Sequence, residues 1–301
     1  MQACSDIDRA RGALLGTFAG DAVGMPFEGA EPVVSAVALE MREARLGAGT
    51  YTDDTQMMIA LAESLIEHDT IRPAALARAF CDSYDPARGY GGGTRRVISL
   101  LQAGVDVQAA ARQVFDGQGS RGNGAAMRVA PIAVRFAADP RRLRGEAAAS
   151  AAVTHAHPVG IDAAVVQAAA IAAALRGEDI LRAALASAET PEITAGLRQA
   201  RALLSAPPVP EEVRTRLGSS SDGARSVATA IYCALAHRTV EQAITFAVRL
   251  GGDTDTVAAM TGAIAAGRDG SHAIPARWLD RLEDGERGLS HVMALASRLL
   301  P

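Results

Sequence analysis

Apolar residues recur every three to four positions along most of the chain, in runs separated by short polar or glycine-rich stretches. This spacing is typical of helices that bury one face. The first predicted helix is apolar at Ile7, Ala10, Leu14 and Phe18. Ser5 or Asp6 can cap its start, and it should end near residues 20–24. The same signals predict helices over 57–66, 73–80, 94–102, 125–130, 140–153, 159–175, 179–188, 192–204, 222–237, 239–250 and 257–267.

Prolines and glycines mark the breaks between these helices. Pro131 should kink or end the helix over 125–130, because proline has no backbone N–H and its ring clashes with the preceding turn. Residues 30–50 form a long irregular connection, and 206–210 (Ala-Pro-Pro-Val-Pro) should be a stiff linker rather than a domain boundary.

The composition favours an all-α fold. Hydrophobic residues make up 49% of the chain and charged residues 21%, which is enough for a substantial core, but only 4% is aromatic. A core of Ala, Leu, Val, Ile and the eight methionines suits closely packed helices better than a β-sandwich.

Charge and cysteine content exclude several function classes. The net charge of −4 and the pI near 5.9 give no sign of a basic face for DNA or RNA. All 30 basic residues are arginine, so lysine-based Schiff-base or general-base chemistry is excluded. Cys4, Cys81 and Cys233 are far apart and form no Cys-x-x-Cys pair. This argues against a disulfide framework and a zinc site, and it fits a reducing compartment.

One stretch mimics a targeting signal, because two arginines precede the apolar run 12–20. Acidic residues on both sides of the run spoil the pattern, so we expect a cytoplasmic amphipathic helix instead. No run approaches the roughly 20 uncharged apolar residues of a membrane span. We therefore expect a cytoplasmic protein with no membrane or nucleic-acid partner, and a monomer is the default.

Two acidic clusters each stand directly before an apolar helix. They are Tyr51-Thr52-Asp53-Asp54-Thr55 and Gly251-Gly252-Asp253-Thr254-Asp255-Thr256. Either cluster alone is more often a helix N-cap than a metal site. If the two helices pack side by side, four carboxylates meet, and they would repel one another without cations. Oxygen-only ligands favour Mg²⁺ or Mn²⁺; two ions would fit, with Asp255 well placed to bridge them.

Other segments supply candidate substrate contacts. The glycine loops over 88–94 and 116–124 each lead toward a predicted helix, where backbone amides can hold a phosphate, although a flexible turn is the simpler alternative. Glu28, between Phe27 and a glycine, is a candidate general acid or base or else an exposed loop residue. His155 is a candidate for substrate contact or a structural role at a helix end, and zinc is not expected there.

Five motifs in order along the chain resemble those of the ADP-ribosylglycohydrolase family, which includes dinitrogenase reductase activating glycohydrolase. They are Gly20-Asp21-Ala22-Val23-Gly24 with Glu28, the cluster 51–55, Gly122-Asn123-Gly124-Ala125-Ala126-Met127-Arg128, Thr154-His155-Ala156, and the cluster 251–256. The match spans about residues 10–267. Arg121 departs from it, standing where some relatives carry an aromatic residue.

The resemblance implies a compact, single-domain, orthogonal multi-helix bundle over residues 1–301, with a central metal-binding cleft and two Mg²⁺ or Mn²⁺ ions. The implied metal ligands are Thr52, Asp53, Asp54, Asp253, Asp255 and Thr256. The implied substrate-binding residues are Gly91, Gly92, Gly93, Ser120, Gly122, Asn123, Gly124, Met127 and His155. Glu28 and Asp54 are the implied catalytic acids, and the residues do not decide which of them handles the proton.

The implied reaction is hydrolysis of the C1″ glycosidic bond of an ADP-ribosylated protein, arginine-linked substrates being favoured, or of another ADP-ribose conjugate. Such cleavage passes through an oxocarbenium-like state, which requires oriented ribose hydroxyls, a positioned water and help for the leaving group. Two alternatives belong to other classes. One is a non-catalytic ADP-ribose-binding or partner-binding module of the same fold, and the other is a metal-dependent phosphatase.

Overall fold

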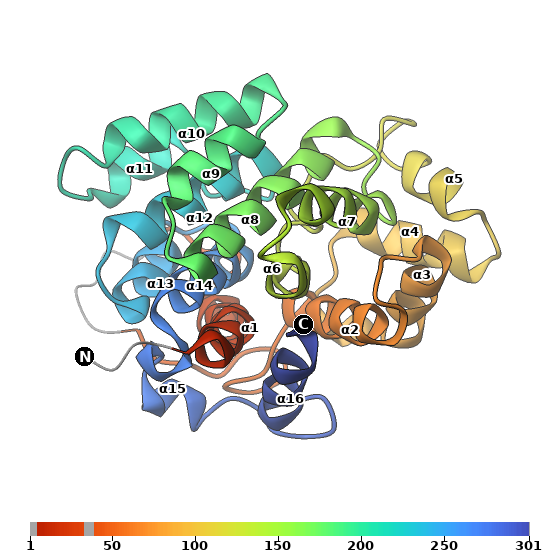
Figure 1. Ribbon diagram of the computed structural model, residues 1–301, viewed down its shortest axis with the longest axis horizontal. Helices are drawn as coiled ribbons and strands as arrows, with labels where there is room; N and C mark the ends of the chain where they lie inside the picture. The colour runs from red at the N-terminus through yellow and green to blue at the C-terminus, as the bar shows by residue number, and fades with distance from the viewer. Residues whose placement is uncertain (1–4, 33–38, 301) are drawn as a thin grey trace.

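The computed structural model describes residues 5–32 and 39–300, and in these ranges the protein contains helices and no β-strand. The α-helices are α1 (Asp6–Gly24), α2 (Asp53–His68), α3 (Pro73–Asp82), α4 (Gly92–Gln102), α5 (Val107–Arg112), α6 (Ala130–Phe136), α7 (Pro140–Ala152), α8 (Pro158–Arg176), α9 (Ile180–Ser187), α10 (Pro191–Leu203), α11 (Pro210–Arg216), α12 (Gly223–Ala236), α13 (Val240–Arg249), α14 (Thr254–Asp269), α15 (Ala276–Leu279) and α16 (Leu289–Leu299). Short 3₁₀ turns are η1 (Met25–Phe27), η2 (Pro86–Arg88) and η3 (Ser271–Ala273). The predicted all-α class is confirmed (Figure 1). That residues 1–301 form one domain stays a prediction.

Most predicted helices are present, and the capping signals behave as expected. The Ser5 side chain accepts a hydrogen bond from the Asp8 amide at the start of α1. Thr239 accepts one from the Gln242 amide at the start of α13. Local side-chain chemistry therefore fixes where these helices begin.

One expectation about proline was wrong, and another held except at its last residue. Residues 125–128 form turns, and Pro131 lies in the first turn of α6 instead of ending a helix. Residues 206–209 form the expected non-helical connection, but Pro210 is the first residue of α11. Both prolines occupy the helix start, where the missing N–H would have had no partner within the helix. The short helix α5 was not predicted.

Helices α1 and α14 lie against each other in antiparallel fashion at unusually close range. Four glycines spaced four residues apart on α1 make this possible: Gly12, Gly16, Gly20 and Gly24. A Cβ atom added at any of them would lie 2.0–2.4 Å from a backbone oxygen of α14. The contact continues to the site end of both helices, where Thr254 Oγ1 donates to the Gly24 carbonyl at 2.8 Å. The end of α1 is thereby fixed beside the start of α14.

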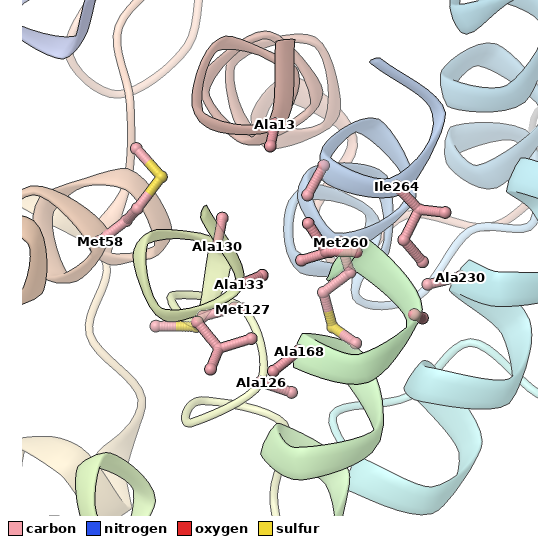
Figure 2. Packing of buried hydrophobic residues seen from close by; sticks show 14 of the residues in the cluster. Ala13, Met58, Ala126, Met127, Ala130, Ala133, Ala168, Ala230, Met260 and Ile264 are labelled. Carbon is pink, nitrogen blue, oxygen red and sulfur yellow. The ribbon is translucent and has the colours of Figure 1, made fainter. Parts of the chain in front are cut away.

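Small side chains and methionines fill the core between the other helices (Figure 2). Ala13 from α1, Ala133 from α6 and Ala168 from α8 are fully buried. Met58 from α2 and Met260 from α14 are fully buried in the same core. This agrees with the predicted core of alanine, aliphatic residues and methionine, because unbranched methionine adapts to irregular gaps.

Helix α8 corrects the expectation that no segment of the chain approaches a membrane span in length and apolar character. It is long and apolar enough to cross a membrane by length and composition, with a mean hydropathy of 1.7, but 83% of its most apolar 18-residue window is buried inside the protein. Helices α7, α9, α12 and α14 cover it. A hydrogen bond also joins α8 to α14 there, since Gln167 Nε2 donates to the Met260 carbonyl at 2.9 Å. The apolar character of α8 is accounted for by its place in the core.

Candidate active site

The two acidic clusters meet where α2 and α14 begin. Asp54 Oδ2 accepts hydrogen bonds from Thr52 Oγ1 at 3.1 Å and from Thr256 Oγ1 at 3.3 Å. The second of these bonds joins residues 202 positions apart in the chain. The close packing of α1 on α14 brings Asp21 to the same place, and Asp21 was not assigned as a site residue from the sequence.

Asp21 is fully buried at the end of α1 and holds the first acidic cluster in shape. Its carboxylate accepts from Thr52 N at 3.0 Å, Thr52 Oγ1 at 2.9 Å, Thr55 N at 3.1 Å and Thr55 Oγ1 at 2.6 Å. Burial raises the pKa of Asp21 to about 6, although these hydrogen bonds act to lower it. One carboxylate thus fixes both ends of the turn that carries Asp53 and Asp54.

The carboxylates of the two clusters are buried close to one another. Burial raises the pKa of Asp53 to about 8, and the charges of Asp21 and Asp253 add to the rise. Burial also raises the pKa of Asp54 and of Asp255 well above the usual aspartate value, and neighbouring carboxylates add to this effect. The pKa of Asp253 is raised by burial as well. Such a cluster favours positive charge beside it.

The donor chemistry fits a hard cation. The donors are carboxylate and hydroxyl oxygens, and Oδ1 of Asp54 is buried with no hydrogen-bond partner, so it is available to bind an ion. Within 5–32 and 39–300, however, no group of three or more His, Cys, Asp or Glu side chains is already arranged to hold a metal ion. Threonine hydroxyls or rotated carboxylates would have to complete the coordination. The two-ion centre therefore stays a prediction.

Asp253 corrects the simple capping interpretation of the second cluster. It occupies the N-cap position of α14, but its side chain makes no capping hydrogen bond. Instead, Asp253 Oδ2 accepts from Asn123 Nδ2 at 2.6 Å. Thr52, in contrast, does cap α2, since its Oγ1 accepts from the Asp54 amide at 3.4 Å. Asn123 thus ties the second glycine loop to the acidic cluster.

A cleft of about 780 Å³ brings together most of the predicted site residues. Those that line it are Glu28, Asp53, Gly91, Gly92, Gly93, Ser120, Gly122, Asn123, Gly124, Met127, His155, Asp253, Asp255 and Thr256. Thr52 and Asp54 are not among the lining residues, because they lie beneath the surface at 1% exposure each. The two glycine loops and the acidic clusters therefore share one cleft.

The first glycine loop opens α4 toward this cleft. Gly91 is the N-cap of α4 and provides no side chain to cap the helix. A Cβ at Gly91 or at Gly92 would meet nothing within 4 Å, so the space in front of the helix start is open. Backbone N–H groups in the first turn of a helix are suited to an anion such as a phosphate.

His155 faces the second glycine loop as a neutral hydrogen-bond donor. Arg128 Nη2 donates to Thr154 Oγ1 at 2.9 Å, and this hydroxyl lies 2.8 Å from His155 Nδ1. Because Arg128 can only donate, the arrangement that satisfies all three groups has Thr154 accept from Arg128 and donate to Nδ1. Burial, and secondly the Arg128 charge, lower the pKa of His155 to about 3. The remaining proton is therefore on Nε2, which lies on the side of Gly122.

Glu28 lies at the edge of the cleft and forms an ion pair with Arg45. Each of the two side chains is 37% exposed. This exposure agrees with the interpretation of Glu28 as an exposed loop residue, and its role as a general acid or base stays a prediction. Nothing in the sequence pointed to Arg45, which lies in the irregular connection and also packs against Gly89.

The comparison with known proteins now decides the family, because the family model described as ADP-ribosylglycohydrolase matches residues 4–301. The chain belongs to the ADP-ribosylglycohydrolase family. Its enzyme class is that of an ADP-ribosylglycohydrolase, and the family expected from the five motifs is confirmed.

Several members of the ADP-ribosylglycohydrolase family are similar over nearly their whole length. ADP-ribosylhydrolase ARH3 of Homo sapiens is 32% identical, with 94% of this chain and 92% of the relative covered. The ADP-ribosyl-[dinitrogen reductase] glycohydrolase of Rhodospirillum rubrum is 27% identical, with 92% and 90% covered. A solved structure titled ADP-ribosylglycohydrolase-related protein complex matches with a TM-score of 0.79 and 30% identity, covering 98% of this chain and 97% of that chain.

This ADP-ribosylglycohydrolase also has cleft residues that the sequence did not reveal. Phe115 lines the cleft with 58% exposure and a positive φ of 54°, which is uncommon for an aromatic residue. Ser220, Ser221 and Asp222 approach from the segment before α12. Arg121, the departure from the family pattern, pairs with Asp222 at 2.8 Å. A lone aromatic or serine in a loop gives no periodic signal, so only the folded arrangement identifies these residues.

Proposed function

We propose that this family member is a divalent-cation-dependent hydrolase that cleaves the C1″ glycosidic bond of ADP-ribosylated proteins or related conjugates and releases ADP-ribose. Arginine-linked protein is the first substrate to test. The observation that carries the proposal is the single cleft lined by both glycine loops and both acidic clusters. In this proposal, the diphosphate would bind beside the cations.

The cations would be held by oxygen ligands from the two clusters. We assign to two Mg²⁺ or Mn²⁺ ions the ligands Thr52, Asp53, Asp54, Asp253, Asp255 and Thr256. When bound, such ions supply Lewis-acid stabilisation of negative oxygen and orient substrate hydroxyls and water. The buried, unpartnered Oδ1 of Asp54 and the raised pKa of the cluster support this assignment.

The glycine loops and His155 bind and orient the substrate in this proposal. Amides at the open start of α4, together with Ser120, hold the diphosphate. His155 donates from Nε2 to a phosphate or hydroxyl oxygen, and its low pKa keeps it a neutral donor at physiological pH. Asn123 holds Asp253 and so fixes the ligand geometry relative to the loop.

Glu28 is the better placed of the two candidate acids for proton transfer. In the reaction, water adds its hydroxyl to C1″, the bond to the leaving group breaks, and the leaving atom gains a proton. The proton donor or acceptor must reach the reacting atoms in the cleft. Glu28 lines the cleft and is partly exposed, whereas Asp54 lies beneath it and accepts hydrogen bonds from two threonines. We therefore assign proton transfer to Glu28 and ion binding to Asp54.

The experiment measures release of free ADP-ribose from a panel of arginine-linked, serine-linked and O-acetyl-linked ADP-ribose. The wild type should release ADP-ribose with Mg²⁺ or Mn²⁺ and stop when EDTA is added. Asp54→Asn and Asp255→Ala should each abolish release while remaining folded by circular dichroism. Full turnover in either variant, or with EDTA, contradicts the mechanism. Binding without release would favour a non-catalytic module, and release of phosphate would favour a phosphatase.

We also propose that the protein acts as a monomer in the cytoplasm, on ADP-ribose-bearing protein or small molecules, without nucleic-acid or membrane partners. The acidic pI supports the lack of a nucleic-acid partner, and the burial of α8 supports the lack of a membrane partner. Light scattering after gel filtration tests the monomer, since a mass of twice 31.0 kDa would show a dimer.

A further inference from the structure

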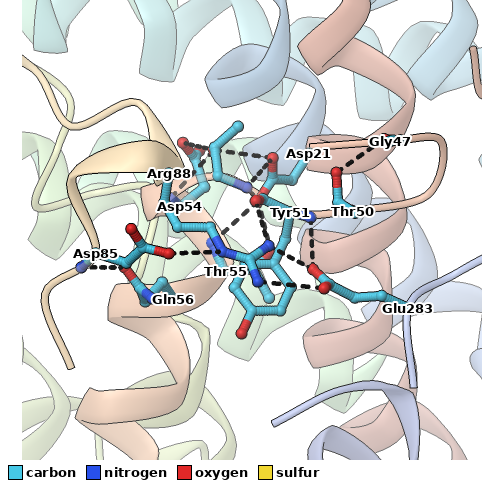
Figure 3. Close-up of polar contacts among 11 residues, drawn as sticks. Asp21, Gly47, Thr50, Tyr51, Asp54, Thr55, Gln56, Asp85, Arg88 and Glu283 are labelled. Carbon is cyan, nitrogen blue, oxygen red and sulfur yellow. Dashed lines mark hydrogen bonds and ion pairs between the residues drawn. The ribbon is translucent and has the colours of Figure 1, made fainter. Parts of the chain in front are cut away.

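The residue directly before the first predicted metal ligand is held by an arginine and a glutamate that do not line the cleft (Figure 3). Tyr51 N donates to Glu283 Oε1 at 2.9 Å, and Arg88 Nη1 donates to the Tyr51 carbonyl at 2.9 Å. The Arg88 guanidinium also lies 3.8 Å from the centre of the Tyr51 ring. Both backbone polar groups and the ring of this one residue are therefore fixed by the pair.

Arg88 and Glu283 also bind each other, through two hydrogen bonds. Arg88 Nη1 and Nη2 donate to Glu283 Oε1 and Oε2 at 2.5 and 3.2 Å. The side chains are only 15% and 26% exposed. A two-pronged, partly buried arginine–carboxylate pair is stronger and more directional than a surface ion pair.

The pair connects three distant segments at the site. Tyr51 leads into the turn that carries Asp53 and Asp54, and Arg88 leads into the glycine loop that opens α4. Glu283 comes from the segment between α15 and α16, and its amide donates to the Gly49 carbonyl at 3.0 Å. The backbone that leads into Tyr51 is thus tied to the C-terminal part of the chain at the Gly49 carbonyl and at the Tyr51 amide.

A second hydrogen bond links the same loop to α2. Tyr90 OH donates to Gln56 Oε1 at 2.7 Å, and Gln56 lies in the first turns of α2 after Asp54. The glycine loop and the acidic turn are therefore joined twice, at Arg88 and at Tyr90. A shift of one segment has to move the other.

We propose that Arg88 and Glu283 are positioning residues that set the geometry of the Thr52–Asp54 turn for divalent-cation binding. The inference rests on the proposed function, because it assumes that this turn supplies cation ligands. Neither residue needs to touch substrate or ion. Their loss leaves the Tyr51 backbone free to shift, so the ligands no longer hold their positions, and the affinity for the cation falls. Partners that orient metal ligands are typically worth about 10- to 100-fold in metal affinity.

The test measures the Kd for Mn²⁺ by electron paramagnetic resonance on the full chain. Arg88→Met keeps much of the side-chain volume but removes every donor, and Glu283→Gln keeps the shape of the side chain while removing its charge. We expect the Kd to rise about 10- to 100-fold for Arg88→Met and by a smaller factor for Glu283→Gln. Excess Mn²⁺ should restore release of ADP-ribose in both variants.

Arg268→Met is the matched control. Arg268 also makes a two-pronged pair, with Asp269, and also donates to a backbone carbonyl, that of Ala234 at 2.8 Å. These side chains are 26% and 27% exposed, but they lie at the end of α14 that is far from the site. The control should lose thermal stability as the test variants do, yet keep the wild-type Kd for Mn²⁺.

Each outcome either supports or overturns the positioning role of Arg88 and Glu283. A raised Kd in Arg88→Met or Glu283→Gln, with a wild-type Kd in Arg268→Met, supports the inference. A wild-type Kd in both test variants overturns it and leaves the proposed function standing. An equal rise in the control also overturns it, because the effect would then be general loss of stability. A wild-type protein that fails to bind Mn²⁺ overturns the inference together with the cation-dependent mechanism.

Discussion

The contact between α1 and α14 should be intolerant of a single methyl group. A Cβ atom at Gly16 would lie 2.2 Å from the Gly262 carbonyl oxygen, 2.6 Å from its carbon and 2.9 Å from Ala266 Cβ. Real Cβ atoms essentially never come within 3.0 Å of such neighbours, so the two backbones would have to separate by about 0.8 Å. Backbone atoms inside a packed helix cannot rotate away as a side chain can.

Two opposing effects set the change in the free energy of unfolding that Gly16→Ala causes. Replacing a glycine inside a helix by alanine stabilises the helix by about 1 kcal/mol. Overpacking a core costs about 1–3 kcal/mol, and a clash with backbone belongs at the upper end. Gly16→Ala should therefore destabilise the protein by about 2 kcal/mol, which lowers the Tm by roughly 4–8 °C in a chain of this order of size.

Gly145→Ala is the matched control, since Gly145 lies inside α7 and a Cβ there would meet nothing within 4 Å. It should keep or slightly raise the Tm. Thermal and urea unfolding followed by circular dichroism measure both variants. If Gly16→Ala unfolds at the same temperature and urea concentration as the wild type, then α1 and α14 do not lie as close together as the structure shows.

Three further results are expected. Burial raises the pKa of Asp53 to about 8, so its contribution to the free energy of unfolding is complete below pH 3.8 and is lost as the pH rises toward 8. The free energy of unfolding of the EDTA-treated protein should therefore fall by about 2 kcal/mol between pH 6.5 and 8. A Tm that does not change over this pH range would count against the buried cluster. Because the pKa of His155 is lowered to about 3, its contribution is complete above pH 6.5 and is lost on acidification. At pH 5 the loss in the free energy of unfolding amounts to about 2 kcal/mol. In urea unfolding, His155→Gln should therefore show a smaller difference in this free energy between pH 5 and pH 7.5 than the wild type does. Nitrogen NMR should show the His155 proton on Nε2. In Thr154→Val, which removes the hydroxyl, the preference for this tautomer should weaken. A proton on Nδ1 in the wild type would contradict the hydrogen bond that Thr154 donates to His155.

Local chemistry made much of the fold predictable. Helix starts at Ser5 and Thr239 follow from side chains that satisfy nearby amides, and this depends only on neighbouring residues. Pro131 was placed wrongly because proline can end one helix or begin the next, and the sequence around it does not decide which. For the same reason, the expected linker over 206–210 held only up to residue 209, since Pro210 begins α11. The apolar run of α8 was likewise ambiguous, since burial in a core and burial in lipid select the same side chains.

The candidate site was partly predictable for a different reason. The residues of the two acidic clusters and both glycine loops were identified because their types and order resemble a family. Asp21 belongs to the first of the five motifs, but the sequence does not indicate its role, because this carboxylate accepts hydrogen bonds from Thr52 and Thr55, 31 and 34 residues away. The glycines of α1 gave a four-residue repeat that was present in the sequence and was not interpreted.

By itself, the sequence determined the all-helical class, most helix starts, the chemical types gathered in the clusters and, through its motifs, the family. These depend on local hydrogen bonds, on apolar spacing and on residue identity. The tertiary structure alone decided which clusters meet, because the meeting depends on how closely α1 and α14 approach. It also decided that Arg88 pairs with Glu283, 195 residues away, around the residue that leads into the acidic turn. Contacts between distant segments arise from packing in three dimensions, and no local pattern records them.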